Sequence, residues 1–211
     1  MQITFLPGSW LHGLGQKLVF FGGMLSLLLV FSSCQSSPAS TFLGTDLGST
    51  PAPTFQLTDQ NGATVALGAL KGHPVVVTFM YSHCPGPCPL LASKLYQASE
   101  ILGEKAQLVD WLAISMDPAG DTIASTTQFV AVHQLTGLLH FLMGTTAELE
   151  PIWKAYFVTV QQQLNAQGTG MTLTHSVGVF LLDQQSRERV YLNDSLTPQM
   201  LATDLQTLLG H

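Results

Sequence analysis

Residues 75–89 read VVVTFMYSHCPGPCP and decide the fold. The continuous apolar run at 75–80 is typical of a strand that is buried on both faces of a sheet. The prolines that follow favour a turn that opens a helix, because proline is well tolerated at the first helical position. Cys84 and Cys88 are therefore expected at the end of a central strand, beside a helix N-terminus, where thiol or metal chemistry is favoured.

Strands and helices alternate around this stretch. Period-two patterns on either side of a turn at 59–62 predict a β-hairpin over 54–67. The order predicts an α/β fold with a thioredoxin-like central sheet flanked by helices and an N-terminal β-hairpin. The later predicted elements are helices at 90–102, 123–133, about 146–156 and 198–209, and strands at 108–116, 138–143, 157–163, 176–182 and 189–192.

The sequence also indicates where several helices begin. Thr122 and Thr197 are candidate N-caps, because a threonine hydroxyl can accept from the first free backbone N–H groups of a helix. Thr145 and Glu148 have the spacing of a capping box.

The first part of the chain has a different character. Residues 18–31 are almost wholly apolar, which is the length of a signal-peptide core rather than of a membrane span. The run closes on Phe31-Ser32-Ser33-Cys34, which resembles a bacterial lipobox with phenylalanine in place of the usual leucine. Cys34 would then carry the lipid. An ordinary cleaved signal and an uncleaved anchor are the alternatives.

This pattern predicts three parts. We expect a lipoprotein-type signal peptide over 1–33, a flexible tether rich in Ser, Thr, Pro and Gly over 34–52, and one folded domain over 53–211. The expected location is the cell envelope, at the outer face of the cytoplasmic membrane, held there by the lipid anchor.

The net charge limits the kinds of partner this chain can bind, and the number of cysteines limits the role of the pair. The net charge is −6 and no cluster of Lys or Arg occurs, which argues against nucleic acid as a partner. Of three cysteines, two remain if Cys34 is lipidated. A disulfide that closes so short a loop would stabilise the fold little, so the pair is better explained by reactivity.

The pair has Cys-x-x-x-Cys spacing. Thiolates are favoured at a helix N-terminus and select Cu(I), Zn or Fe–S clusters, but two sulfurs leave most metals under-coordinated. His175 is the candidate third ligand, because the loop before the strand at 176–182 is expected to pack against the cysteine loop and contains no proline. A structural or surface histidine is the alternative. A Cys₂His set suits copper.

Three motifs together resemble the Sco/SenC family of copper-binding proteins: YSHCPGPCP at 81–89, SMDPAGDT at 115–122, and Thr-His-Ser at 174–176. The similarity runs from about residue 53 to the C-terminus. The resemblance implies a thioredoxin-like fold that binds one copper ion through Cys84, Cys88 and His175, and a role in building the dinuclear copper centre of cytochrome c oxidase. Gly86-Pro87 departs from the residues usual between the two cysteines, and we expect it to stiffen the loop without removing a ligand.

Two functions remain open. The first is a copper metallochaperone, with the copper-binding subunit of the oxidase and a copper donor as partners. The second is an enzyme, a thiol–disulfide oxidoreductase that reduces the partner's copper-binding cysteines with Cys84 and Cys88 as its redox pair and draws on a thiol reductant. A peroxiredoxin-like peroxidase is disfavoured, because Tyr81 stands where the threonine of its Thr-x-x-Cys motif is expected.

Other residues have plainer interpretations. Asp117 and Asp121 either shape the site or serve turn and cap chemistry. His83 either tunes the thiols or points away, and Met171 is a further soft donor near His175. The residues interpreted as core, structural or surface are Met80, Met116, Trp111, Trp153, His73, His133, His140 and His211.

Overall fold

The computed structural model describes Gln2 and residues 42–164, 171–174 and 178–210. The chain divides into two units, Met1–Ala39 and Ser40–His211, and every element below belongs to the second. Apart from Gln2, the predicted signal peptide lies outside the described residues, as do Cys34, His175 and His211. Among the helices of the described part, none is both long enough and apolar enough to cross a membrane.

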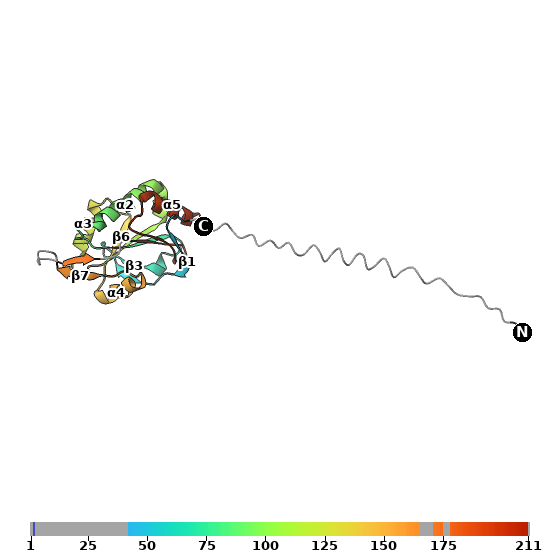
Figure 1. Ribbon diagram of the computed structural model, residues 1–211, viewed down its shortest axis with the longest axis horizontal. Coiled ribbons are helices and arrows are strands. Elements are labelled where there is room, and N and C mark those ends of the chain that lie inside the picture. The colour runs from blue at the N-terminus through green and yellow to red at the C-terminus, as the bar shows by residue number, and fades with distance from the viewer. Residues whose placement is uncertain (1, 3–41, 165–170, 175–177, 211) are drawn as a thin grey trace. The chain divides into compact units, whose positions relative to one another are not determined.

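A six-stranded mixed sheet forms the centre of this unit, with the strand order β1-β10-β9-β4-β5-β6 (Figure 1). The predicted strand over 75–80 is β4; it lies parallel to β5 and antiparallel to β9, and each of its residues is buried. A strand that is covered on both faces favours such a nearly continuous apolar run, and its one polar residue, Thr78, donates its hydroxyl to the Gly178 carbonyl. The strands are β1 (Thr45–Pro51), β4 (Val75–Met80), β5 (Asp110–Ser115), β6 (Leu139–Leu142), β9 (Val179–Leu182) and β10 (Arg187–Leu192).

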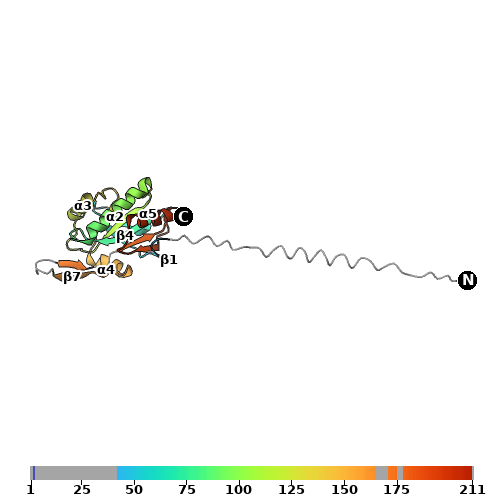
Figure 2. The same cartoon turned by 45° about the horizontal axis from the view of Figure 1, so that its top comes forward.

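Helices cover both faces of the sheet. Figure 2 shows α2 (Pro87–Leu102), α3 (Ile123–Val132) and α5 (Pro198–Leu209) together on one face and α4 (Thr146–Ala155) on the other. Ring contacts agree: Phe129 of α3 meets Phe141 of β6 from the first face, with ring centroids 5.6 Å apart. The predicted α/β fold, with a central sheet flanked by helices, is confirmed.

The predicted helix caps are present. The hydroxyls of Thr122, Thr145 and Thr197 each accept from the backbone N–H three residues later, at 3.1, 3.3 and 3.2 Å. The Glu148 carboxylate in turn accepts from the Thr145 N–H at 2.7 Å, which completes the capping box. These bonds fix where three of the helices begin.

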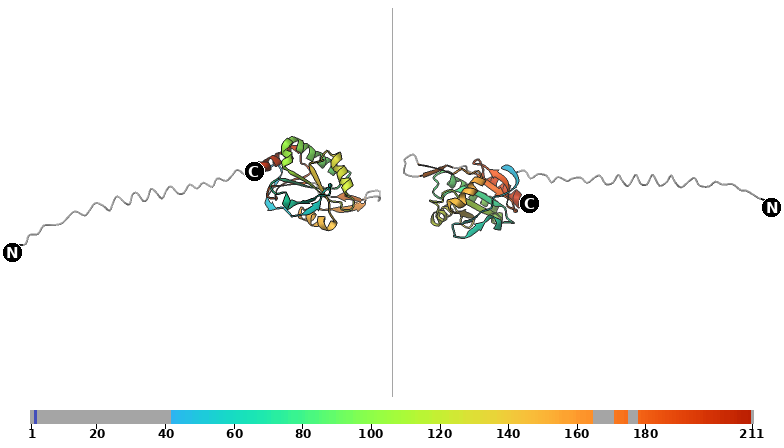
Figure 3. Two further views of the ribbon diagram at one scale, coloured as in Figure 1. Left: turned by 180° about the vertical axis from the view of Figure 1, so that it is seen from behind. Right: turned by 90° about the horizontal axis from the view of Figure 1, so that it is seen from below.

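Two hairpins stand apart from the main sheet. The predicted N-terminal hairpin consists of β2 (Gln56–Thr58) and β3 (Thr64–Ala66), and a bridge between Thr58 and Met143 joins it to the chain after β6. A second hairpin, β7 (Gln161–Leu164) with β8 (Met171–Thr174), projects from the rest of the unit (Figure 3). The sequence predicted no strand at 171–174. Two short 3₁₀ turns complete the described elements, η1 (Leu67–Ala69) and η2 (Gly103–Leu108).

The structure differs from the expected tether over 34–52. Residues 45–51 form β1, which pairs antiparallel with β10 at the edge of the sheet. Just before it, the buried Asp204 carboxylate of α5 accepts from the N–H groups of Leu43 and Gly44, at 2.7 and 2.9 Å. Almost every residue of β1 is exposed, so its sequence carries no apolar alternation that would reveal a strand.

Candidate metal centre

Cys84 and Cys88 lie together after the carboxyl end of β4, where α2 begins. The Cys84 side chain is 6% exposed and the Cys88 side chain 1%. Gly86 is the N-cap of α2 and Pro87 its first residue, so no side chain at the cap position accepts from the helix. The Cys84 sulfur takes over part of that role, since the Cys88 N–H points at it with an N···S distance of 3.4 Å.

The two thiols have different environments. A hydrogen bond with the Cys84 side chain, followed by burial, raises the pKa of Cys88 far above its usual range. The charges of Cys84 and Asp121 act in the same direction, and a hydrogen bond with the Tyr81 backbone opposes them. These influences favour the protonated form of Cys88. The preference for a thiolate at the helix N-terminus stays a prediction. Cys84 is the acceptor of the pair, and Cys88 must lose its proton before both sulfurs can bind a metal.

A buried carboxylate holds the start of the cysteine loop. Asp121 Oδ1 accepts from the Ser82 N–H at 2.8 Å and from Ser82 Oγ at 2.6 Å, and Oδ2 accepts from Ser115 Oγ at 2.6 Å. Burial raises the pKa of Asp121, while the bonds from Ser115 and Ser82 act in the opposite direction. These three bonds tie the residue two before Cys84 to the end of β5.

Two roles were considered for Asp117 and Asp121, namely shaping the site and forming a local turn, and each residue has one of them. Asp121 shapes the cysteine loop from 39 residues away in sequence. The Asp117 side chain accepts from the Gly120 N–H at 3.0 Å, which is local turn chemistry. Nothing in the Asp-Pro-x-x-Asp sequence distinguishes the two, because the serines that bind Asp121 are brought to it only by the pairing of β4 with β5.

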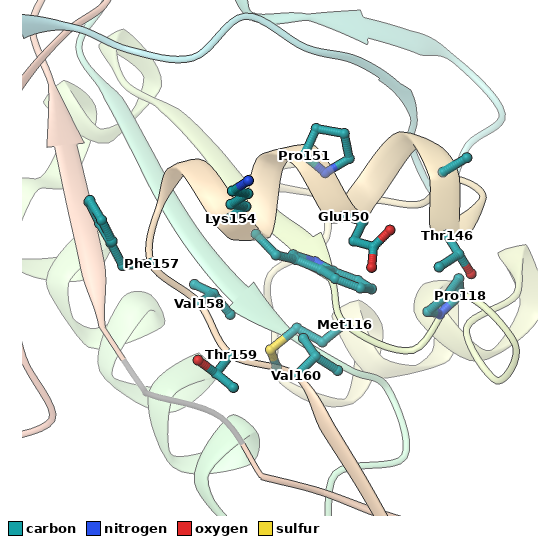
Figure 4. A pocket seen from close by; sticks show the side chains of 12 residues that line it. Met116, Pro118, Thr146, Glu150, Pro151, Lys154, Phe157, Val158, Thr159 and Val160 are labelled. Atoms are coloured by element: carbon teal, nitrogen blue, oxygen red, sulfur yellow. The ribbon is translucent and has the colours of Figure 1, made fainter.

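The remaining candidates lie where their plainer interpretation places them. Met80 and Met116 are fully buried, and in Figure 4 the Met116 sulfur points toward Val160 at the floor of a surface pocket of about 1090 Å³ between α4 and the chain that leads to β7. Trp111 is fully buried and Trp153 nearly so. Both methionines and both tryptophans are therefore core residues; Met171 lies in β8, and its side chain is outside the described part.

The described histidines have structural or surface partners. His83 Nδ1 lies 3.1 Å from Ser82 Oγ. His73 pairs with Asp110 at 3.3 Å, His140 pairs with Asp59 at 2.9 Å, and the His133 ring packs on Phe129 with centroids 4.5 Å apart. Burial lowers the pKa of His133. Each of these contacts accounts for its histidine without a metal.

The described residues supply two sulfur donors and no complete metal site. Within 42–164, 171–174 and 178–210, no three His, Cys, Asp or Glu side chains come together as a metal-binding group. The chain re-enters the described part at Gly178, whose carbonyl accepts from Thr78 Oγ1 of β4 at 2.9 Å. Two adjacent buried thiols fit a soft metal such as copper. A third ligand is needed from elsewhere, and the predicted one, His175, lies outside the described residues.

Comparison with known proteins identifies relatives along the whole folded unit. The family model described as SCO1/SenC matches residues 45–210. Protein SenC of Rhodobacter capsulatus is 29% identical over 156 residues, 74% of this chain and 69% of its own length. Across three curated relatives, this chain spans between 59% and 69% of their lengths.

Solved structures match in the same region. ScoI of Bradyrhizobium japonicum, solved with copper bound, is 30% identical with a TM-score of 0.68; the match covers 75% of this chain and 99% of that one. BsSco, in which a disulfide switch was identified and which is described as a member of the Sco family of cytochrome c oxidase assembly proteins, is 22% identical. Its TM-score is 0.64, over 79% of this chain and 96% of that one. The predicted thioredoxin-like character of the sheet agrees with these neighbours.

Proposed function

The chain belongs to the SCO1/SenC family, and from this premise we propose that it is a copper metallochaperone. It binds one copper ion as cargo through Cys84, Cys88 and His175, and it assists assembly of the dinuclear copper centre of cytochrome c oxidase. Its partners are a copper donor and the copper-binding subunit of the oxidase.

The observation that carries this proposal is the pair of buried thiols held in contact at the N-terminus of α2. A disulfide across four residues would add little stability, so stability does not account for the pair. Thiolate and imidazole together are a donor set that copper accepts well. A homologue 30% identical to this chain is known with copper bound, which supports the same cargo here.

The residues around the pair support loading and release. Asp121 fixes Ser82 and thereby the path of the loop into Cys84. The first sulfur that copper meets is Cys84, the more exposed acceptor, and the Cys88 proton leaves as the second sulfur binds. Release to a partner follows by exchange of one ligand at a time.

The predicted signal peptide supports a location for this exchange of copper. The apolar run at 18–31 and Cys34 support export and lipid attachment at the outer face of the cytoplasmic membrane, where the copper-binding domain of an oxidase would be reached. Lipid at Cys34 also leaves Cys84 and Cys88 as the only thiols of the mature chain.

The test is a copper titration of the reduced full chain. In separate titrations with Cu(I) and with Cu(II), we expect wild type to bind one equivalent of either ion. His175→Ala should lose more affinity than the roughly 10–100-fold that removal of an outer-shell partner costs. The Cys84→Ser/Cys88→Ser variant should bind neither ion tightly. His83→Ala, which removes an exposed histidine beside the pair, is the matched control and should bind as wild type. Unchanged copper binding in His175→Ala would rule out the proposed Cys₂His site.

A second function is favoured by the asymmetry of the thiols. In a thiol–disulfide exchange, the Cys84 thiolate attacks a partner disulfide and forms a mixed disulfide. Cys88 then gives up its proton and attacks Cys84, which releases the partner as a dithiol and leaves a Cys84–Cys88 disulfide. An external thiol reductant must supply two electrons to restore the pair. We expect this exchange to survive His175→Ala and to fail in Cys88→Ser, which halts at the mixed disulfide.

A further inference from the structure

A shallow groove begins at Pro87, the residue before Cys88, and runs between α2 and the loop that joins β10 to α5. It holds about 80 Å³. One wall is a stripe of α2 whose members recur every three or four residues, which places them on one side of the helix. The other wall is the loop. The lining residues are Pro87, Leu90, Leu91, Lys94, Asp194 and Leu196. We call this feature the α2 groove.

Hydrogen bonds hold the two walls of the α2 groove together. Lys94 Nζ donates to the Asp194 carbonyl at 3.2 Å, across 100 residues of sequence. Within the loop, Asn193 Oδ1 accepts from the N–H and the hydroxyl of Ser195, at 3.0 and 2.6 Å. The Leu196 N–H donates to the Asn193 carbonyl at 3.0 Å. The groove is therefore formed in the free protein, so a partner that docks there does not have to order this loop.

Leu90 is exposed at this groove, although the apolar residues beneath it are buried. Its side chain is 61% exposed, whereas Leu91 is 3% and Leu196 1% exposed. Pro85 and Pro87 are exposed as well. An apolar surface thus surrounds the entrance to the cysteine pair, and contiguous apolar surface of this kind marks a place of contact with another molecule.

Size and charge restrict what fits the α2 groove. Small-molecule sites usually hold about 300–1,000 Å³, so a groove of about 80 Å³ accommodates one side chain rather than a free ligand. No Asp, Glu, Lys or Arg occurs between residues 74 and 93, and the two charged residues of the groove, Lys94 and Asp194, have opposite signs. An aliphatic side chain matches this neutral surface, whereas a charged one would lose hydration without gaining a net counter-charge.

The position of the groove indicates which molecule supplies that side chain. Cys84 and Cys88 are 6% and 1% exposed, so exchange of copper or of a disulfide at these sulfurs requires a partner in direct contact with the surface around them. The α2 groove continues that surface, because Pro87 both lines the groove and precedes Cys88 in the first turn of α2.

We propose that the α2 groove is a docking site for the cysteine-bearing segment of the protein that takes copper or electrons from the pair. Leu90 and Leu196 receive an aliphatic side chain of that segment while its sulfur reaches Cys84. This inference rests on the function proposed above and adds to it the chemistry by which the partner is recognised.

A metal-free exchange assay with the reduced full chain tests the docking site. The probes are the peptides Ac-Leu-Gly-Cys-Gly-Leu-NH₂ and Ac-Asn-Gly-Cys-Gly-Asn-NH₂, each joined through its cysteine to 5-thio-2-nitrobenzoate. The Cys84 thiolate attacks the peptide sulfur, a protein–peptide disulfide forms, and the coloured thionitrobenzoate leaves as a thiolate. We expect the leucine peptide to react about 3–10-fold faster than the asparagine peptide, because a partly buried leucine gains part of the free energy of full burial.

Three variants identify the source of the preference. Leu90→Ser should bring the rates of the two peptides close together. Ile101→Ser removes an exposed aliphatic side chain near the other end of α2 and should keep the wild-type ratio, which makes it the matched control. Cys84→Ser/Cys88→Ser measures the release of thionitrobenzoate caused by Cys34, which is subtracted. The symmetric reagent without peptide, 5,5′-dithiobis(2-nitrobenzoate), should react with Leu90→Ser as with wild type, which shows that the pair is intact.

Equal rates for the two peptides with wild type, a preference that Leu90→Ser retains, or no reaction with either peptide overturns the docking site. The assay contains no copper, so its outcome is separate from that of the copper titration. A chain that binds no copper but prefers the leucine peptide loses the metallochaperone function and keeps the docking site. A chain that binds copper and treats the two peptides alike does the reverse.

Discussion

At the scale of single residues, Asp121 holds the start of the loop that leads from β4 into Cys84. It is buried, it accepts three hydrogen bonds, and it joins Ser82 of the loop to Ser115 of β5. Its charge is also one of the influences that raise the pKa of Cys88. A single carboxylate thus sets both the position of the loop and part of the electrostatics of the thiols.

We therefore expect Asp121→Asn to lower the free energy of unfolding by about 2 kcal/mol, because an amide cannot accept at both of its ends. The same change should move the pH profile of thiol alkylation by iodoacetamide to lower pH, since one negative charge near Cys88 is gone. Chemical denaturation and alkylation rates measure the two effects.

Asp117→Asn is the matched control. Among the described residues, its side chain accepts from the Gly120 N–H alone, so its loss should cost less than about 1 kcal/mol and leave the alkylation profile in place. Equal effects of the two substitutions would show that Asp121 has no special role in positioning the loop.

At the scale of elements, Asp59 connects the β2–β3 hairpin to the main sheet. Its carboxylate accepts from the N–H groups of Asn61 and Ala63 at 2.8 Å each and lies 2.9 Å from His140 Nδ1 of β6. Burial is the largest single influence and raises the pKa of Asp59, but the hydrogen bonds from His140, Ala63 and Asn61 together bring it below its ordinary value of 3.8.

Because the pKa of Asp59 is lowered in the fold, the stability of the fold depends on pH. A carboxyl group with a lowered pKa in the folded state stabilises the fold fully above its unfolded pKa, here near 3.8, and loses that contribution as the pH falls through the folded pKa. We expect Asp59→Asn to cost about 2 kcal/mol in urea denaturation at pH 6, and we expect the gap from wild type to narrow at pH 3 and below.

The exposed Asp46 provides a control for this pH dependence, because within the described part of the chain its side chain accepts from the Gly48 N–H alone. Asp46→Asn should differ little from wild type at either pH. A gap between wild type and Asp59→Asn that stays constant from pH 6 to pH 2 would contradict the account of this contact.

The start of β9 depends on a close approach between Gly178 and Tyr191 of β10. A Cβ at Gly178 would lie 2.8 Å from Tyr191 Cζ, closer than van der Waals contact allows. We expect Gly178→Ala to destabilise the fold by roughly 1–3 kcal/mol, the usual cost of overpacking. In a Tyr191→Ala background the same change should be nearly neutral, and Gly68→Ala, which meets only open space, is the control. A full cost that persists without the Tyr191 ring would point to another cause.

At the scale of the whole molecule, the sequence correctly predicted those elements that are determined by residues close to them in the chain. The apolar run of β4, the prolines that open α2, and the caps Thr122, Thr145 and Thr197 depend on neighbours in sequence, and all were predicted correctly. The adjacency of Cys84 and Cys88 follows from the same stretch.

The features that sequence missed depend on distant contacts. β1 is mostly exposed and is held by backbone bonds to β10 and by Asp204 of α5, about 160 residues away, so composition alone suggested a tether. Asp121 could not be distinguished from Asp117 without the pairing of β4 with β5.

The central claim is that copper binds to two sulfurs and one imidazole of this chain. X-ray absorption spectroscopy of the copper-loaded full chain, wild type beside His175→Ala, tests it most directly. The account predicts two sulfur scatterers in both proteins and imidazole scattering in wild type that disappears in the variant. Copper surrounded only by nitrogen and oxygen in wild type, or imidazole scattering that survives in His175→Ala, would contradict it.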